Sequence, residues 1–469
     1  MESTAWFDHG AARSGRSWRA ADAPEVEPAT LRFPPGFHWG VATSAHQVEG
    51  GNGANTWAEW ELTTRPDGRP TIHSGDRCGR AADHWEMFDT DLALMRWLGV
   101  DVYRFSVEWS RVEPLPGHLD DAALERYRSW CLRLVEAGIT PMITLHHFTE
   151  PSWTGERGGF AHRGTVADWL RFVGVCVERL GDLVTNWVTV NEPVAYVTQG
   201  WVRGEWPPGR RDPGQAAVVL ENLLLAHAAA YRVIHAADRA DHRHQVGLAH
   251  NIMPLRARHP LNPWNAAATR MLDRTYNRAV PDALHTGLLR LRLPGTALTV
   301  NHPGLRGTQD FFGLNHYHRA LVDTRPREPG MPVDLVPTPG ERNDLGWTLE
   351  PSSIGEVLRW TRRYGLPVII TEHGTVDGAT PDLRRRRFLG ACLAEIADAV
   401  RDGVDVRGYL HWSLMDNFEW SHGFSAQCGL FRVDRGDFHR TPTTSAGYFR
   451  EVIAAQPGHG FTQEPIHAR

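Results

Sequence analysis

Eight short apolar runs, separated by longer amphipathic stretches, are the feature that most restricts how this 469-residue chain can fold. Each run has the length and the β-branched, aromatic-rich composition of a buried parallel strand. The runs lie at residues 37–43, 100–106, 139–146, 186–191, 245–250, 310–315, 367–372 and 406–412. Helices are expected at 80–98, 120–137, 166–180, 215–236, 381–402 and 443–455. Repeated alternation of strand and helix predicts an α/β fold, a (β/α)8 TIM barrel.

A doubly wound open sheet is the alternative arrangement of such elements, but no Gly-x-Gly-x-x-Gly follows the first run. Barrels of this class tolerate long insertions, so we expect one domain over residues 31–457. Residues 1–30 are expected to be a disordered N-terminal extension, and residues 458–469 a C-terminal tail. Rim insertions that contain Gly and Pro are expected at 47–79, 202–214, 255–265 and 318–345.

Composition excludes several classes of function. The net charge of −5 and the pI near 6.6 give no support for partners such as nucleic acids or anionic membranes. All 50 basic residues are arginine, which excludes a lysine Schiff base and a P-loop lysine. The five scattered cysteines do not form a disulfide framework or a zinc-binding pattern, so a reducing compartment is expected. No signal peptide and no run of 18 apolar residues is recognisable, which predicts a cytoplasmic location.

Polar or aromatic side chains follow nearly every predicted strand. In a (β/α)8 barrel the carboxyl ends of all strands meet at one face, where active sites lie. We therefore expect these residues to surround one cleft: Gln47, Arg104, His147, Asn191, Glu192, Asn251, Asn315, Tyr317, Glu372 and Trp412.

Two glutamates in this set have the chemistry of glycosidic bond cleavage. Glu192 follows Thr-Val-Asn and precedes Pro193, and Glu372 lies in Ile-Thr-Glu-His-Gly, each at the end of an apolar run. Such cleavage uses two carboxyl groups, one as proton donor and one as nucleophile or base. The 19 tryptophans suit a cleft that stacks on sugar rings, although many must belong to the core. The alternative is that both glutamates are ordinary surface acids in strand–helix loops.

A series of motifs in consistent order strengthens the first interpretation. From about Phe33 to Phe449 the chain resembles glycoside hydrolase family 1, the β-glucosidase family. The opening motif is Phe-Pro-Pro-Gly-Phe-His-Trp-Gly-Val-Ala-Thr-Ser-Ala-His-Gln-Val-Glu-Gly at 33–50. The others are Tyr-Arg-Phe-Ser at 103–106, Thr-Leu-His-His at 144–147, Asn-Glu-Pro at 191–193, Asn-Leu-Leu-Leu-Ala-His at 222–227, Asn-His-Tyr at 315–317, Ile-Thr-Glu-His-Gly at 370–374 and Trp-Ser-Leu-Met-Asp-Asn-Phe-Glu-Trp at 412–420.

The resemblance implies a role for each matching residue. Glu192 would be the acid/base and Glu372 the nucleophile. Trp412 would stack under the sugar, and Arg104, Asn315 and Tyr317 would support the nucleophile. The sugar hydroxyls would be bound by Gln47, His147, Asn191, Glu419 and Trp420. No cofactor and no metal is implied. Taken alone, Arg104 could be a buried ion-pair residue and Trp412 a core residue, and for Asn251 we favour a role in bridging backbone groups.

Physical chemistry gives reasons for these assignments. Arg104 and a Tyr317 hydroxyl would favour the ionised form of Glu372. The charge of Glu372 and apolar surroundings would raise the pKa of Glu192, so that it holds a proton. If the pair works with retention of configuration, the two carboxyl groups should lie about 5–5.5 Å apart.

Several positions depart from the family pattern. His46 stands where tyrosine is usual, Phe148 where tryptophan is usual, and Cys428 where an aromatic residue flanks the C6 side of the sugar. A small thiol would leave room, so glucose, galactose, fucose or a substituted sugar remain open. The sequence predicts a retaining exo-β-glycosidase that hydrolyses a small-molecule or oligosaccharide β-glycoside. The alternatives are a transglycosidase on the same machinery and an inactive carbohydrate-binding barrel.

Overall fold

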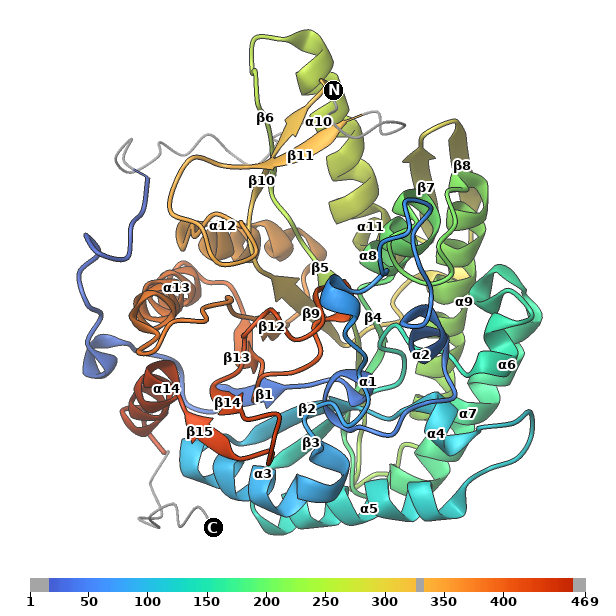
Figure 1. Ribbon diagram of the computed structural model, residues 1–469, viewed down its shortest axis with the longest axis horizontal. Coiled ribbons are helices and arrows are strands. Elements are labelled where there is room, and N and C mark those ends of the chain that lie inside the picture. The colour runs from blue at the N-terminus through green and yellow to red at the C-terminus, as the bar shows by residue number, and fades with distance from the viewer. Residues whose placement is uncertain (1–16, 326–332, 459–469) are drawn as a thin grey trace.

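A closed barrel of eight parallel strands forms the centre of the molecule (Figure 1). The computed structural model describes residues 17–325 and 333–458. Around the barrel the strands follow the order β1-β2-β3-β4-β5-β9-β12-β13, and β13 closes on β1. Their bounds are β1 His38–Ala42, β2 Val102–Ser106, β3 Thr140–Thr144, β4 Asn186–Asn191, β5 Gln245–Asn251, β9 Phe311–His316, β12 Val368–His373 and β13 Val406–Trp412. The predicted (β/α)8 barrel is confirmed, and all eight apolar runs are barrel strands.

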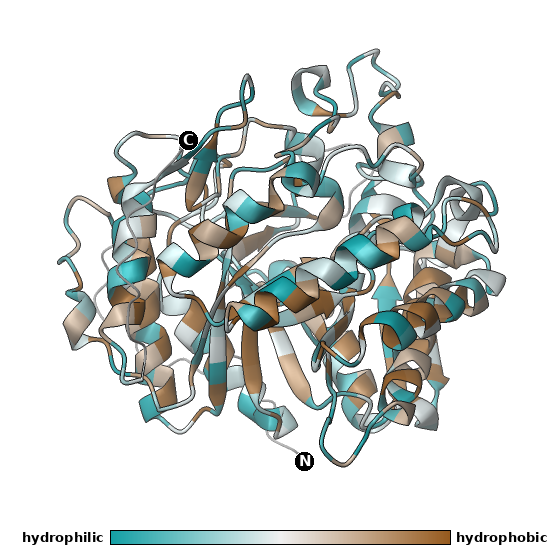
Figure 2. Ribbon diagram, turned by 90° about the horizontal axis from the view of Figure 1, so that it is seen from below, coloured by the Kyte–Doolittle hydropathy of each residue, from teal (hydrophilic) through white to brown (hydrophobic). Residues whose placement is uncertain are grey.

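Long helices surround the barrel: α3 His84–Leu98, α5 Asp121–Glu136, α7 Gly164–Leu180, α9 Pro213–Ala236, α12 Ser352–Thr361, α13 Leu383–Arg401 and α14 Thr444–Ala454. They begin where the sequence supplies a cap, since Asp120, Asp212 and Thr443 each accept a hydrogen bond from a first-turn backbone N–H. In Figure 2 the helices carry both hydrophilic and hydrophobic residues, as expected of elements with one face on a core.

Helix α9 is apolar enough, by length and composition, to cross a membrane. Within the described part of the chain, no other helix meets this criterion. Of the apolar window of α9, 61% is buried inside the protein. Its buried side chains include Leu220, Leu223 and Leu224, and it packs against α7. The composition of α9 is therefore explained by its place in the helical shell.

The first described residues differ from the expected disordered extension. Residues 17–30 lie against the α13 and α14 side of the barrel. The Arg387 side chain donates to the carbonyl of Ala20, the Tyr448 hydroxyl donates to the carbonyl of Val26 at 2.8 Å, and the Trp18 ring contacts Phe388. The prediction of disorder is therefore wrong for residues 17–30, because apolar and backbone groups there find partners on the helices. Residues 1–16 and 459–469 lie outside the described residues.

Insertions at the carboxyl ends of the strands contain more regular structure than the sequence indicated. Segments expected as loops form a three-stranded sheet of β6 Leu255–Ala257, β10 Ala320–Asp323 and β11 Asp334–Pro337, at the top of Figure 1. The chain between β6 and β9 also forms α10 Pro263–Leu272, the π-helix η5 Asp273–Arg278, α11 Ala279–Thr286 and the hairpin β7 Leu288–Leu293 with β8 Thr296–Asn301, and α10 packs against β6 and β10.

The remaining elements are short. The α-helical turns are α1 Ala45–Val48, α2 Thr56–Trp60, α4 Trp109–Val112, α6 Ser152–Gly155 and α8 Pro193–Val197, and the strands are β14 Phe431–Val433 and β15 Arg440–Pro442. The 3-10 turns are η1 Pro28–Thr30, η2 His73–Gly75, η3 Gly159–Ala161, η6 Pro303–Leu305, η7 Arg362–Tyr364 and η8 Trp420–His422, and η4 Thr198–Arg203 is a π-helix.

The register of the barrel is irregular where the two glutamates lie. Strand β4 shifts against β5 between Val188 and Asn191, and β12 shifts against β9 between Ile370 and Glu372. Such irregularities re-aim the side chains that follow them. After β12 the chain must pass close to β13, because a Cβ on Gly374 would meet the Trp412 carbonyl oxygen at 2.1 Å.

Candidate active site

A cavity of about 860 Å³ opens at the carboxyl ends of the barrel strands. Eight of the eleven site residues expected from sequence line it: His147, Asn191, Glu192, Tyr317, Glu372, Trp412, Glu419 and Trp420. The other three, Gln47, Arg104 and Asn315, are fully buried directly behind this lining and bond to it. The structure thus brings together all eleven expected residues.

Four lining residues, among them three close to the strand ends, hold an unusual backbone conformation. Phe148, Glu192 and Trp420 have φ values of 71°, 43° and 51°, in the left-handed region that non-glycine residues seldom adopt. Each such residue costs about 1–3 kcal/mol and persists only where its surroundings fix it. For Glu192 the fixing contacts are a backbone hydrogen bond to the Ala249 carbonyl at 2.8 Å and Pro193 at the start of α8.

Glu372 is held by a cation and a hydroxyl. Its Oε1 accepts from Nη1 of Arg104 at 2.6 Å, and its Oε2 accepts from the Tyr317 hydroxyl at 2.6 Å. Arg104 is fixed in turn, because Nε donates to Thr144 at 3.0 Å and Nη2 donates to Oδ1 of Asn191 at 2.7 Å. The pair is a buried, charge-assisted contact of the strong kind.

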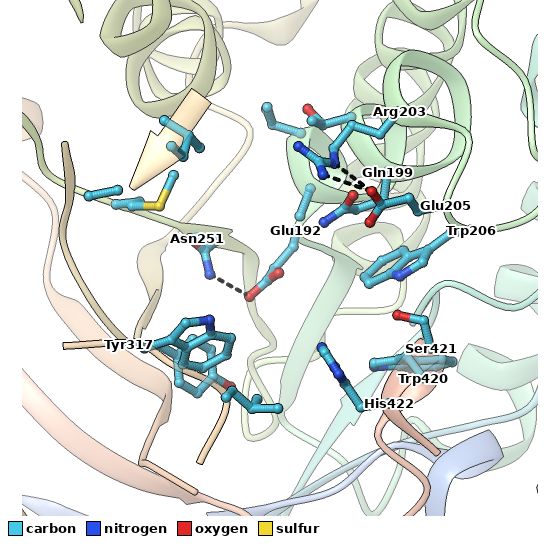
Figure 3. A pocket seen from close by; sticks show the side chains of 18 of the residues that line it. Glu192, Gln199, Arg203, Glu205, Trp206, Asn251, Tyr317, Trp420, Ser421 and His422 are labelled. Carbon is cyan, nitrogen blue, oxygen red and sulfur yellow. Dashed lines mark hydrogen bonds and ion pairs between the residues drawn. The ribbon is translucent and has the colours of Figure 1, made fainter. Parts of the chain in front are cut away.

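Glu192, by contrast, is held by neutral amides. Its Oε1 accepts from Nδ2 of Asn315 at 2.8 Å and from Nδ2 of Asn251 at 3.1 Å, a contact drawn in Figure 3. Our preferred reading of Asn251 as a backbone bridge is therefore wrong, since its amide reaches a carboxylate. Its position at the end of a predicted strand had placed Asn251 at the cleft, and only the role expected for it was wrong.

Asn315 connects the two carboxyl groups. Besides its bond to Glu192, its Nδ2 donates to Oδ1 of Asn191 at 3.1 Å, and its Oδ1 accepts from the hydroxyl of Thr371, next to Glu372. Burial raises the pKa of Glu372, and hydrogen bonding by Asn315 is one of the smaller effects that oppose this rise. Its contacts therefore extend beyond support of Glu372, the role the resemblance implied.

These environments separate the two pKa values. Burial, and then the negative charge of Glu372, raise the pKa of Glu192 to about 8, against smaller opposing effects of Asn315 and Asn251. Burial also raises the pKa of Glu372, but the Arg104 charge and the Tyr317 hydrogen bond oppose it. Near neutral pH, Glu192 therefore retains its proton while Glu372 is the carboxyl group with a cation to stabilise its ionised form.

A polar and aromatic group lies beside Glu372. Nε2 of Gln47 donates to Oε2 of Glu419 at 3.1 Å, and burial followed by the Glu372 charge raises the pKa of Glu419 to about 7. The His147 ring stacks on Trp412 and Trp420, with centroids at 5.7 and 6.1 Å. This group offers flat apolar faces and hydrogen-bonding groups together.

His147 also has a free polar atom. Burial and the Arg104 charge hold the pKa of His147 well below its usual value, so the ring is neutral. Its Nε2 lies 3.2 Å from Nδ2 of Asn191, which can only donate, so Nε2 accepts and Nδ1 carries the hydrogen. Within the described residues Nδ1 is buried without a partner.

The departures from the family pattern lie in or around the same cavity. Cys428 and Phe148 line it, and Sγ of Cys428 lies 3.9 Å from Oε2 of Glu419. His46 lies behind the lining and stacks on Trp420 at a centroid distance of 5.9 Å. Sequence reasoning did not identify Gln199, Trp206, Tyr276 and Trp347, which also line the cavity. They belong to the inserted segments, where no strand end marks them.

Among residues 17–325 and 333–458, the metal-type ligands that lie within 4.8 Å of one another are His46, Glu61 and Cys78. Their polar atoms already have partners. His46 Nε2 lies 2.9 Å from Oε1 of Glu61, and the Cys78 backbone N–H donates to Oε2 of Glu61 at 2.8 Å. In the described part of the chain, the histidine pairs His146–His147, His242–His244 and His316–His318 do not belong to a group of three ligands.

The geometry supports chemistry that needs one protonated and one ionised carboxyl group at the same cavity. The former can donate a proton to a leaving oxygen and the latter can attack a carbon or stabilise positive charge. The stacked aromatic rings and hydrogen-bonding groups beside them suit the two faces and the hydroxyls of a sugar ring.

Comparison with known proteins points in the same direction. The family model for glycosyl hydrolase family 1 matches residues 29–457. A thermostable β-glucosidase B from Thermobispora bispora is 34% identical over 459 residues, which cover 90% of this chain and 91% of that protein. A β-glucosidase A from Thermotoga maritima is 31% identical over 455 residues, 90% and 98% of the two chains. The solved structure of a β-glycosidase from Pyrococcus horikoshii superposes with a TM-score of 0.81 at 34% identity and covers 91% of this chain and 95% of that one.

Proposed function

Because this chain belongs to glycosyl hydrolase family 1, we propose that Glu192 and Glu372 cleave a terminal β-glycosidic bond by double displacement. The family consists of β-glycosidases that retain configuration, and the chain is a glycoside hydrolase acting on O-glycosyl bonds. The observation that carries the residue assignment is the unequal setting of the two carboxyl groups. Glu372 bonds to the Arg104 cation, whereas within the described residues the Glu192 carboxyl group bonds to the amides of Asn251 and Asn315.

In the first step, a carboxylate oxygen of Glu372 bonds to the anomeric carbon as the bond from that carbon to the leaving oxygen breaks. Glu192 gives its proton to the leaving oxygen, so the aglycone departs as a neutral alcohol. The product is a glycosyl ester of Glu372. Asn191, fixed by Arg104 and Asn315, would hydrogen-bond the sugar, a contact type that strengthens toward the oxocarbenium-like transition state.

The second step reuses Glu192 in its ionised form. Formation of the ester removes the negative charge of Glu372, which is one of the causes of the raised pKa of Glu192. The pKa of Glu192 therefore falls, and the group can accept a proton from water. That water attacks the anomeric carbon, the ester bond breaks, and Glu372 leaves as a carboxylate. Two inversions give net retention.

For the sugar itself we propose a glycone held between Trp412 and the hydrogen-bonding groups of Gln47, His147 and Glu419. This placement is supported by His147, Trp412 and Glu419, which line the cavity together, and by the stacking of the His147 ring on Trp412. Cys428 replaces a larger side chain beside Glu419, so we propose a pocket that accepts sugars other than glucose at the C6 side. Initial rates on a panel of 4-nitrophenyl β-glycosides test this, and a strict glucoside preference would refute the wider pocket.

Hydrolysis is the reaction that the relatives favour over transfer to another acceptor. An inactive carbohydrate-binding barrel is not favoured, because both carboxyl groups are present and held at the cavity. We also propose a cytoplasmic location, supported by five buried and unpaired cysteines in the described chain. Localisation of the tagged full-length chain by cell fractionation tests that proposal.

The anomeric configuration of the first product tests the mechanism. We expect proton NMR during early turnover of a 4-nitrophenyl β-glycoside to show the β-anomer first, with the α-anomer appearing only by mutarotation. The α-anomer as first product would mean inversion and would remove the nucleophilic role from Glu372.

A further inference from the structure

The outer part of the cavity has an apolar wall built by the inserted segments. It comprises Met253, Leu255, Leu272, Tyr276, Leu293 and Val336, which we call the apolar wall. We propose that the apolar wall binds a bulky hydrocarbon aglycone, so that the substrates of this protein are β-glycosides of apolar alcohols rather than oligosaccharides. This inference rests on the proposed function and specifies the leaving group.

The apolar wall lies on the side from which the proton must come. Glu192 accepts a hydrogen bond from Asn251, and the Tyr276 hydroxyl donates to Oδ1 of Asn251 at 3.4 Å. Two residues beyond Asn251, the backbone N–H of Met253 donates to Oδ1 of Asn277 at 2.9 Å, which ties this segment to η5. A general acid must lie within hydrogen-bonding distance of the leaving oxygen. The leaving group therefore extends past Glu192 toward the apolar wall.

The side chains of the apolar wall suit hydrocarbon better than sugar. Met253 and Leu255 pack into a local core with Leu272 and Tyr276 beside them. Apart from Tyr276, whose hydroxyl already donates to Asn251, the apolar wall consists of branched and thioether side chains, which have no flat face for a pyranose and no strong hydrogen-bonding group. A second sugar would leave its hydroxyls facing these groups without partners, which is costly when water is excluded. A hydrocarbon bound there loses no hydrogen bonds and gains by leaving water.

On the opposite side of the cavity, two charged side chains are paired with each other. Figure 3 shows Arg203 and Glu205 joined to each other, with Nη2 of Arg203 donating to Oε1 of Glu205 at 2.7 Å. Trp206 and Trp420, which also line the cavity, lie on the same side as this pair (Figure 3).

The size of the cavity permits such an aglycone. Pockets that enclose drug-sized ligands commonly measure about 300–1,000 Å³, and this one, at about 860 Å³, lies toward the upper end of that range. One sugar ring leaves much of that volume free, and the free part is the part that the apolar wall borders.

The test compares leaving groups of similar basicity. With the sugar fixed at the one the enzyme prefers, kcat/KM is measured for the methyl and the n-hexyl β-glycoside. It is also measured for the β-1,4 disaccharide with the same sugar at its non-reducing end. A buried methylene contributes up to about fourfold, so we expect the hexyl glycoside to exceed the methyl glycoside by at least about tenfold. It should also exceed the disaccharide.

Two variants locate the effect. Leu272→Asn and Leu293→Asn place an isosteric amide in the apolar wall. Each should lower kcat/KM for the hexyl glycoside by about fivefold or more and leave the methyl glycoside within about twofold. Leu261→Asn is the matched control, since Leu261 is fully exposed on the turn before α10 and should change neither value.

The outcomes separate the two proposals. Equal rates on methyl and hexyl glycosides, a faster disaccharide, or variants that affect both alkyl substrates alike would overturn the hydrocarbon-binding wall while leaving the glycosidase intact. Absence of turnover on every β-glycoside in the wild-type protein would instead refute the proposed function.

Discussion

The two parts of the cavity are built in different ways. At its inner end, Glu192, Glu372 and their partners stand on the carboxyl ends of barrel strands and are joined by hydrogen bonds of 2.6–3.1 Å. At its outer end, the apolar wall comes from segments inserted between strands and is held mainly by packing. The inner end is thus fixed by the barrel, whereas the outer end varies with what is inserted.

This difference assigns chemistry to one part and choice of leaving group to the other. A change at the inner end should alter rates whether or not the leaving group reaches the apolar wall, because bond cleavage takes place there for every substrate. A change at the outer end should alter only the rates on substrates that reach it. Variants at the inner end test the first expectation, and Leu272→Asn and Leu293→Asn test the second.

The largest effect is expected for Glu372→Ala. Loss of the nucleophile should lower kcat by about 10⁴-fold or more on methyl and hexyl glycosides alike. Azide should restore turnover of an activated aryl glycoside, because it can attack from the vacated side, and should yield the α-glycosyl azide. If the variant kept near-normal activity, or if the azide product were the β-anomer, Glu372 would not be the nucleophile.

A loss that depends on the leaving group is expected for Glu192→Gln. General acid catalysis is worth about 10²–10⁴-fold, and alkyl glycosides should lose that factor. Activated aryl glycosides should be spared in the first step, since their leaving oxygens need no proton. Equal loss on both substrate types in single-turnover experiments would contradict the acid role.

The dependence of the wild-type kcat/KM on pH should reflect the ionisation of Glu192 and Glu372. Glu192 must be protonated in the first step, and its pKa of about 8 means that kcat/KM should fall as the pH rises beyond that value. Glu372 must be ionised, and burial raises its pKa, so kcat/KM should also fall on the acidic side from a pH above that of a free glutamate. In Glu192→Gln, assayed with an aryl substrate, the alkaline fall should disappear.

A smaller effect is expected for Tyr317→Phe. This change removes the hydrogen bond to Glu372, which is worth about 1.5–3 kcal/mol to a charged group, or about 10- to 150-fold in rate. It should also raise the pKa of Glu372, so the acidic limb should move to higher pH. Tyr231→Phe is the matched control, because it breaks a similar bond to Asp310 away from the cavity. An unmoved acidic limb in Tyr317→Phe would show that the hydroxyl does not stabilise the ionised carboxylate.

The smallest effect is expected for Asn251→Ala. In the wild-type protein, the hydrogen bond from Asn251 lowers the pKa of Glu192. Its removal should therefore raise that pKa and move the alkaline limb of the profile to higher pH. A neutral bond of about 0.5–1.5 kcal/mol corresponds to about 2- to 10-fold in rate. Asn262→Ala, at the exposed cap of α10, should leave the profile unchanged. A shift of the limb to lower pH would contradict the assigned contact.

The sequence predicted the inner end well for a physical reason. Polar residues at the ends of apolar runs are easy to recognise in a sequence. Because all strands of the barrel are parallel, their carboxyl ends lie at the same face, so Arg104, Asn191 and Glu372 could be predicted to lie together. The link made by Asn315 to both carboxyl groups could not be foreseen. It depends on the register shift between Ile370 and Glu372, which no alternation pattern reveals.

The outer end of the cavity could not be predicted from the sequence, because no recognisable pattern marks the inserted segments. Strands β6, β10 and β11 have three or four residues each, too few to show a period. Leu255 and Val336 become neighbours of one cavity only through the pairing of β10 with both β6 and β11. Met253 and Tyr276 read as ordinary apolar residues until the fold turns them toward Glu192.

The central claim is that Glu372 attacks the sugar while Glu192 supplies the proton. Its most direct test is to inactivate the protein with an activated 2-deoxy-2-fluoro β-glycoside, which forms the ester quickly and hydrolyses it slowly, and to map the label by mass spectrometry of peptides. We predict one sugar per chain, attached to Glu372. A label on Glu192 or on any other residue, or continued turnover with no covalent adduct, would contradict this account.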